Sequence, residues 1–155
     1  MICEEVALGR HRLYMGAMRQ ASTILTFATP GRGFTEITRE IAAWVDGTRI
    51  AEGMLTLLCR HTSASLLIQE NAAPAVKTDL ARWFERLAPE GDHYVHDDEG
   101  SDDMPAHLRA TLTGVTLSIP IQRGRMLLGT WQGLYLAEHR RAPHHREVAL
   151  HLIGE

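Results

Sequence analysis

The chain has 155 residues, a hydrophobic share of 45%, a charged share of 23% and a formal net charge of -3. This length fits one domain with a proper core, and the ordinary globular composition excludes extensive disorder. The slight negative charge, without a block of basic residues, argues against a general nucleic-acid-binding protein. The longest apolar stretches are far shorter than a bilayer requires, so we expect no membrane association.

The cysteines and the N-terminal segment together predict a cytoplasmic protein. Cys3 and Cys59 are too few for a disulfide framework or a metal-binding knuckle, and Cys59 lies in an apolar run typical of a buried thiol. The start of the chain is acidic and lacks the apolar run of a signal peptide. The apolar residues within 1–17 do not recur with the period of a helix or a strand. We therefore expect an N-terminal extension there, followed by one domain over 18–155.

The first half of the domain predicts strands and helices in alternation. Alternating β-branched residues indicate strands, whereas apolar residues three and four positions apart indicate amphipathic helices. Glycine and proline clusters mark the ends of these elements. The expected elements are a strand over 20–29, a helix from Thr35 to Gly47, one long strand over 54–68 and a helix from Pro74 to Leu87.

The second half predicts a short helix and then only strands and turns. Asp103 is the expected N-cap of the helix, and Gly114 follows its end. The expected elements are the helix over 104–112 and strands over 115–121, 126–139 and 147–153. Helices followed by a β-meander indicate a single-domain α+β fold with a largely antiparallel sheet.

Two polar residues stand on the predicted strand over 54–68 or at its end. His61 precedes small hydroxyl residues such as Ser63, which leave room for a ligand beside the imidazole. A histidine that is simply hydrogen-bonded at a sheet face explains the pattern equally well. Glu70 follows at the strand end, where a carboxylate can act in a site or can stabilise the next helix N-terminus.

An acidic run between the second and third predicted helices suggests a metal site. From His96 to Asp103, five carboxylates occupy eight positions, and the spacing does not match a calcium-binding EF-hand. A solvated acidic loop is the plain interpretation of such a run. His107 follows at once, however, and two imidazoles that bracket carboxylates can hold a divalent ion such as zinc or manganese.

Other motifs carry weaker indications. Trp131 stands between glycines, which suggests a close approach of the backbone, but a packed core tryptophan is the favoured interpretation. The basic turn over 140–146 can bind phosphate groups or can simply be solvated. The glycine-flanked elbow of a serine hydrolase and the glycine-rich loop of a nucleotide-binding protein are both missing from the sequence.

Four stretches of the sequence, in one order over about 18–153, form a recognisable pattern. They are His61-Thr62-Ser63-Ala64 through Glu70-Asn71-Ala72, the acidic loop ending in Ala106-His107, Ile119-Pro120, and Gly124-Arg125 through Gly129-Thr130-Trp131-Gln132. Together they resemble the secondary thiamine-phosphate synthase (YjbQ-like) family. The acidic loop departs from the family pattern, because its Asp-Asp-Met-Pro stands where many relatives have a short Gly-Asn stretch.

The resemblance implies an antiparallel β-sandwich with flanking helices, a homotrimer, and a secondary thiamine-phosphate synthase activity. In that reaction a hydroxymethylpyrimidine diphosphate joins a thiazole phosphate and releases pyrophosphate, so small phosphorylated heterocycles are the expected partners. Two alternatives stay open: a metal-dependent phosphohydrolase, and a non-catalytic trimeric module that binds a metal or a phosphometabolite.

The resemblance also implies a set of site residues and a divalent metal cofactor, either zinc or magnesium/manganese. The implied catalytic residues are Glu70, Asp79, Gln132 and Glu138; the substrate-binding residues are Ser63, Asn71, Thr130 and Trp131; the metal ligands are His61, His96 and His107.

Overall fold

The computed structural model describes residues 17–91 and 93–155. The expected extension lies outside the described part, apart from its last residue. The elements in chain order are β1 (Arg19–Thr29), β2 (Gly33–Glu36), α1 (Thr38–Thr48), β3 (Glu52–Cys59), β4 (Ala64–Glu70), α2 (Pro74–Leu87), α3 (Asp103–Thr113), β5 (Thr116–Gln122), β6 (Arg125–Met126), β7 (Gln132–Glu138) and β8 (His144–Gly154). None of the helices in these ranges is long and apolar enough to cross a membrane.

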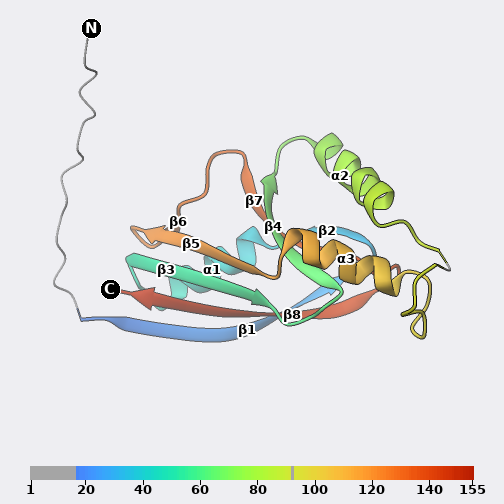
Figure 1. Ribbon diagram of the computed structural model, residues 1–155. Coiled ribbons are helices and arrows are strands. Elements are labelled where there is room, and N and C mark those ends of the chain that lie inside the picture. The colour runs from blue at the N-terminus through green and yellow to red at the C-terminus, as the bar shows by residue number, and fades with distance from the viewer. Residues whose placement is uncertain (1–16, 92) are drawn as a thin grey trace, which may run out of the picture.

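The strands form two antiparallel sheets that pack face to face (Figure 1). Sheet A has the strand order β1-β8-β3-β5-β6, and sheet B has the order β2-β7-β4. Every strand pair in both sheets is antiparallel. The predicted α+β fold with an antiparallel β-sandwich and flanking helices is therefore confirmed.

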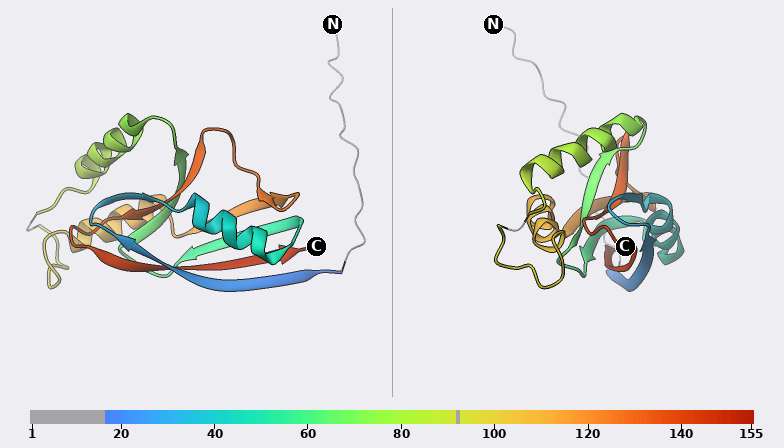
Figure 2. Two further views of the ribbon diagram at one scale, coloured as in Figure 1. Left: turned by 180° about the vertical axis from the view of Figure 1, so that it is seen from behind. Right: turned by 90° about the vertical axis from the view of Figure 1, so that its right-hand side faces the viewer.

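The core lies between the two sheets and α1. Alternate residues of each strand point inward, as a period of two requires. Two helices, α2 and α3, cover the opposite face of sheet B, while none of the described helices lies on the outer face of sheet A (Figures 1 and 2). The buried side chains of the core include Leu55, Leu57, Ile119, Val148 and Leu150 from sheet A, Leu66, Leu134 and Leu136 from sheet B, and Ile37, Ile41 and Val45 around α1.

Three predicted elements differ from the structure, because strand pairing between distant segments sets where the observed elements begin and end. The single strand expected over 54–68 is broken at residues 60–63, where the chain leaves sheet A as β3 and enters sheet B as β4. The strand expected over 126–139 likewise divides between β6 in sheet A and β7 in sheet B. Thr35 lies in β2 rather than in a helix, because it pairs with Leu136 of β7, and α1 begins at Thr38.

The start of α3 also differs from the prediction. Asp102 occupies the N-cap position and makes no side-chain cap hydrogen bond, whereas Asp103 is the first helical residue. Asp103 is buried, and its carboxylate contacts Arg140 and His96 instead of the helix backbone.

A buried carboxylate joins the two sheets at one end of the sandwich. Glu138 is the last residue of β7 in sheet B, and its side chain accepts hydrogen bonds of 2.7 and 2.6 Å from Arg146 of β8 in sheet A. The hydroxyl of Thr29 in β1 donates a further bond of 2.8 Å. Burial alone would raise the pKa of Glu138, but these bonds outweigh it and lower the pKa, so the group is ionised.

A second buried polar group lies beneath the helices that cover sheet B. His139 is 2% exposed, and its Nε2 lies 2.8 Å from the hydroxyl of Ser65. Thr113 of α3 donates to the same hydroxyl at 2.6 Å, and the ring of Phe84 meets the imidazole edge-on. Burial, with the nearby charge of Arg109, lowers the pKa of His139 to about 4.

We expect Arg146→Met to reduce the free energy of unfolding by about 3–5 kcal/mol, because the substitution leaves the Glu138 carboxylate buried without its partner. Urea denaturation followed by circular dichroism measures this loss. The double variant Arg146→Met/Glu138→Leu removes both charges and should recover most of it. A single variant as stable as the parent would mean that the pair does not hold the sheets together.

We expect acidification to destabilise the fold through His139. In the unfolded chain this histidine binds a proton near pH 6.5, whereas the folded chain resists protonation down to about pH 4. Stability is therefore lost as the pH falls through this window, by about 2 kcal/mol between pH 7 and pH 5. Urea titrations at pH 7, 6 and 5 should show a shallower pH dependence for His139→Gln. His145→Gln, at an exposed histidine, is the control. The same pH dependence of stability in the parent and both variants would show that His139 does not cause the acid destabilisation.

Candidate metal centre

Three side chains from the acidic segment and α3 form a compact group of possible metal ligands. One ligand atom from each of His96, Asp103 and His107 lies within 4.8 Å of the other two. The Oδ2 atom of Asp103 is 2.8 Å from Nε2 of His96 and 3.5 Å from Nε2 of His107. Asp103 and His107 are four residues apart on one helix, so their side chains share a face. His96 reaches them from the irregular segment between α2 and α3.

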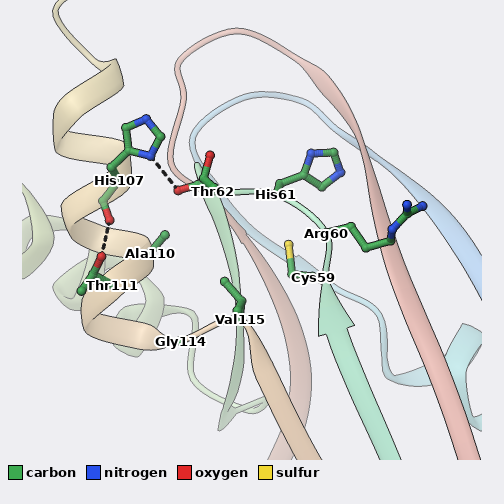
Figure 3. Close-up of a pocket in the computed structure, with 9 residues that line it drawn as sticks. All are labelled: Cys59, Arg60, His61, Thr62, His107, Ala110, Thr111, Gly114 and Val115. Atoms are coloured by element: carbon green, nitrogen blue, oxygen red, sulfur yellow. Dashed lines mark hydrogen bonds between the residues drawn. The ribbon is translucent and has the colours of Figure 1, made fainter. Parts of the chain in front are cut away.

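The second ring nitrogen of His107 is directed at the Asp103 carboxylate. Its Nδ1 lies 3.1 Å from the carbonyl oxygen of Thr62, and a carbonyl can only accept a hydrogen bond (Figure 3). Nδ1 therefore carries a proton, and Nε2 is the ring nitrogen that faces Asp103. Nε2 of His107 and Oδ2 of Asp103 lie 3.5 Å apart, and either a proton or a metal ion between them stabilises this arrangement.

Arg140 holds the Asp103 carboxylate in this orientation. Its Nη1 donates to Oδ1 of Asp103, which leaves Oδ2 for the two histidines. The same guanidinium contacts Oδ2 of Asp102 at 3.3 Å and the carbonyl of Glu99 at 2.7 Å. Burial alone would raise the pKa of Asp102, but the Arg141 amide and Arg140 outweigh it and lower the pKa. The acidic run is therefore partly neutralised by arginine.

His61 lies apart from this group. Its Nε2 accepts a hydrogen bond of 2.8 Å from the backbone amide of Glu147, so the lone pair that a metal would need is already used. Burial and the neighbouring charge of Arg146 lower the pKa of His61, which keeps the ring neutral. Of the three expected metal ligands, the structure brings together His96 and His107, with Asp103 as the third member.

His61 and His107 nevertheless border the same hollow. Its volume is about 610 Å³, and it lies where the connection between β3 and β4 passes α3 (Figure 3). His107 stands on one side of it, and His61 and Arg60 stand on the other. Hydroxyl groups of Thr62 and Thr111 also belong to its lining. The hollow is open to solvent, and its one arginine, Arg60, is paired with Glu147 at 2.5 Å.

A second group of expected site residues gathers at the other end of sheet B. Glu70 pairs with Gln132 across β4 and β7, and both line a hollow of about 580 Å³ with Trp131. The backbone amide of Asn71 donates to the carbonyl of Trp131 at 3.0 Å. Thr130 is exposed in the adjoining loop.

The structure tests how the sequence was interpreted at Trp131 and Glu70 in this second group. Trp131 is 66% exposed, so the interpretation as a packed core residue is wrong. Glu70 accepts a bond of 3.2 Å from the amide of Ala73 at the start of α2, as a helix-stabilising carboxylate would.

The expected residues therefore do not form one site within the chain. The register pairs Glu70 with Gln132 and Ala64 with Glu138, at opposite ends of the β4–β7 ladder. Six residue steps along a strand span about 20 Å. Ser63 and Glu138 belong to the end near His61, where Ser63 accepts a bond of 3.1 Å from Arg146.

Asp79 belongs to neither end of the ladder. Its side chain is 76% exposed on α2, where it lies 3.5 Å from Arg82.

Interpretation of the sequence did not single out two residues of the metal group. Asp103 was one of five carboxylates between the two imidazoles and the expected helix cap, although its spacing of four residues from His107 on a helix was a usable signal. Arg140 carried no signal of this kind, because it lies in a turn 37 residues from Asp103.

Comparison with known proteins gives one consistent family. A family model described as UPF0047 protein YjbQ-like matches residues 23–155. The UPF0047 protein sll1880 of Synechocystis is 51% identical over 138 residues, which cover 88% of this chain and 94% of that protein. The UPF0047 protein YjbQ of Escherichia coli O157:H7 is 43% identical over 132 residues, which cover 84% of this chain and 96% of that protein.

Solved structures agree with this result. The conserved hypothetical protein TT1486 from Thermus thermophilus has a TM-score of 0.72 and 38% identity, covering 83% of this chain and 97% of that one. A YbjQ-like protein of unknown function from Sulfolobus solfataricus has a TM-score of 0.83, covering 90% of this chain and 100% of that one. Its identity is 21%, so this second likeness supports the fold alone.

The comparisons correct the activity expected from the sequence. The similar proteins carry only the names of an uncharacterised family, and neither they nor the family description mention thiamine-phosphate synthesis or any other catalysis. The assignment as a thiamine-phosphate synthase transferase is therefore wrong, whereas the YjbQ-like part of the resemblance is confirmed.

Proposed function

The chain belongs to the UPF0047 (YjbQ-like) family, and we propose that it binds a divalent transition-metal ion through His96, Asp103 and His107. The observation that carries this proposal is the position of Nε2 of His107, which faces the Asp103 carboxylate from 3.5 Å while the Thr62 carbonyl holds Nδ1. An imidazole lone pair and a carboxylate oxygen at this separation are the ligand pair that a metal ion would bridge.

The spacing and the donor types support an ion of the zinc kind. Ligand atoms about 2.0–2.2 Å from a tetrahedral ion lie about 3.3–3.6 Å from one another, a range that includes the separation between His107 and Asp103. His96 is 2.8 Å from the same oxygen and would withdraw slightly; its side chain is 48% exposed and has room to do so. Two imidazoles with one carboxylate favour zinc or a similar transition metal over magnesium, which prefers oxygen ligands.

The groups around the ligands also suit a metal. The Thr62 carbonyl fixes the tautomer of His107, and Arg140 fixes the carboxylate of Asp103, as outer contacts of metal ligands commonly do. Three protein ligands leave at least one coordination position for water or another ligand, and a bound ion would supply Lewis acidity there. A small phosphorylated molecule is the partner we propose for the hollow that His107 shares with Arg60.

We also propose that the chain assembles as a homotrimer through the outer face of sheet A. Nine outward positions form three rows across β1, β8 and β3 in the observed register, and none of them carries a formal charge. Four are large apolar side chains that are 39–49% exposed. A face that exposes large apolar side chains without formal charges is typical of a surface that packs against another copy. The rows are Ile24-Ala149-Leu58, Ser22-His151-Thr56 and Gln20-Ile153-Met54.

The metal proposal predicts one bound ion per chain in protein purified without a histidine tag and titrated with zinc. We expect His107→Gln and Asp103→Asn to weaken zinc binding by at least about 100-fold, because each removes a ligand. Arg140→Gln should weaken it by about 10-fold, since it frees the carboxylate without removing a ligand. Isothermal titration calorimetry measures these constants.

His145→Gln is the matched control for the metal experiment, because His145 is exposed and lies outside the ligand group. Circular dichroism should show an unchanged fold in all variants. Full zinc content in His107→Gln, or zinc binding by the parent that is no tighter than by a non-specific surface histidine, would rule out the proposed centre.

The trimer proposal predicts a mass of about three times the 17.3 kDa chain by light scattering at micromolar concentration. We expect Leu58→Asp to shift the protein toward the monomer, because it buries a charge in the proposed interface. Leu127→Asp places the same change at a comparably exposed apolar residue in the loop after β6 and should leave the mass unchanged. A parent protein that is cleanly monomeric would reject the assembly.

A further inference from the structure

His151 lies at the centre of the proposed assembly face, which consists of the nine outward positions of β1, β8 and β3. In the observed register it pairs with Ser22 of β1 and with Thr56 of β3, so it occupies the middle of the three rows. It is the one residue of the nine whose side chain changes its charge near neutral pH. The other eight are aliphatic, hydroxyl, thioether or amide side chains: Ile24, Ala149, Leu58, Ser22, Thr56, Gln20, Ile153 and Met54.

A hollow of about 480 Å³ opens at the same place on the face. Its lining includes His151, Ile24, Leu58, Ser22, Thr56 and Ala149. None of the described helices lies over this face (Figure 1). A concave and largely aliphatic surface suits the side chains of a second copy, and assembly there would enclose the imidazole of His151.

The groups that face this imidazole are neutral. Its Nε2 lies 3.3 Å from Oε1 of Gln20. Ser22 and Thr56, the partners on its two sides, offer hydroxyl groups, and β5 adds Ser118 opposite Thr56. None of these four side chains can supply the negative charge that would offset a proton on the ring.

The nearest charged residues along β8 stand at the two ends of the face. Glu147 and Glu155 are each four residues from His151, which is about 13 Å along an extended strand. Glu147 is already paired with Arg60 at 2.5 Å, and Glu155 lies against the backbone of Glu52. Charges at such a distance are largely screened, since the Debye length is about 10 Å at 0.1 M salt. A proton on His151 therefore gains little from either carboxylate.

Enclosing His151 in this contact favours the neutral imidazole. A buried charge without a partner is strongly unfavourable, whereas in separate chains the same ring is in contact with water. Histidine ordinarily gains its charge as the pH falls from about 8 to about 5. Separate chains therefore bind more protons in acid than assembled chains do, and by linkage a fall in pH favours the separate chains.

We propose that His151 makes the assembly of this chain sensitive to pH, so that the homotrimer forms at neutral pH and separates as the pH falls below about 6.5. This inference rests on the proposed homotrimer. It is independent of the metal centre, because none of the three proposed ligands belongs to the face. Three equivalent histidines titrate in each trimer, which makes the dependence on pH steep.

Light scattering of a dilution series of the full chain in EDTA, at pH 7.5 and at pH 5.5, tests this proposal. Each histidine should favour the separate chains about tenfold more at the lower pH, so the dissociation constant of the trimer should rise about 1000-fold. This constant scales with the square of the concentration. The concentration at which half of the chains are assembled should therefore rise about 30-fold. Circular dichroism should show folded chains at both pH values.

Two variants separate His151 from the other histidines. His151→Gln keeps a polar side chain that does not titrate, and its assembly should be the same at both pH values. His145→Gln changes an exposed histidine outside the nine positions and should keep the full response. In the parent, the slope of the logarithm of the dissociation constant against pH should correspond to about three protons per trimer near pH 5.5, whether or not a variant packs well.

A parent trimer with the same dissociation constant at both pH values would overturn the proposal, and so would a pH dependence that persists in His151→Gln. A parent that is monomeric already at pH 7.5 would reject the homotrimer itself and this inference with it. A trimer that loses its response to pH in His151→Gln but not in His145→Gln would support both.

Discussion

The ionised carboxylate of Glu138 is the contact on which both the sandwich and the proposed metal centre depend. It lies at the end of sheet B and receives Arg146 and Thr29 from sheet A, so two separate sheets become one body. The same carboxylate accepts the backbone amide of Arg140 at 2.9 Å and thereby fixes the turn after β7. Arg140 then orients Asp103 toward the histidines. A bond that stabilises the fold is thus also the first step in positioning the site.

Asp103 and His107, one turn apart at the start of α3, connect this helix to several other parts of the chain. Asp103 is nearly fully buried, yet it is shared between a guanidinium and two imidazoles. His107, one turn later, reaches the connection between the sheets through Thr62. The metal group therefore rests on the sandwich from two directions, through Arg140 on one side and through Thr62 on the other. This support explains how an 11-residue helix can keep the proposed ligands in place.

Local patterns in the sequence were sufficient for the class of fold and for most elements. The period of two in β1 and β8 and the apolar stripe of α2 are local properties, so they could be predicted from neighbouring residues. The breaks at residues 60–63 and 127–131 could not, because both flanking runs are apolar and only the existence of two sheets separates them. Thr35 entered a strand for a similar reason, since its partner Leu136 is distant in the sequence.

The residues of the candidate site also fall into two groups, those that local sequence patterns can predict and those that only tertiary contacts define. His96 and His107 could be found because histidines beside carboxylates are a local signal. His61 could not be separated from them, since the amide of Glu147 that occupies its Nε2 comes from another strand. Arg140 likewise acquires its role only when α3 packs against the turn after β7. Contacts between segments remote in the sequence therefore decide which of several polar residues belong to one site.

The uneven exposure of the three ligands has a consequence for the rate at which a metal would enter and leave. Asp103 is 3% exposed and His107 is 30% exposed, whereas His96 is 48% exposed and lies on an irregular segment. Exchange of the ion would then begin with the withdrawal of His96, while the two helical ligands keep their positions. The lifetime of the bound ion would be governed by the motion of the segment over 93–102 rather than by the stability of the sandwich. Affinity and exchange rate would accordingly be set by different parts of the chain.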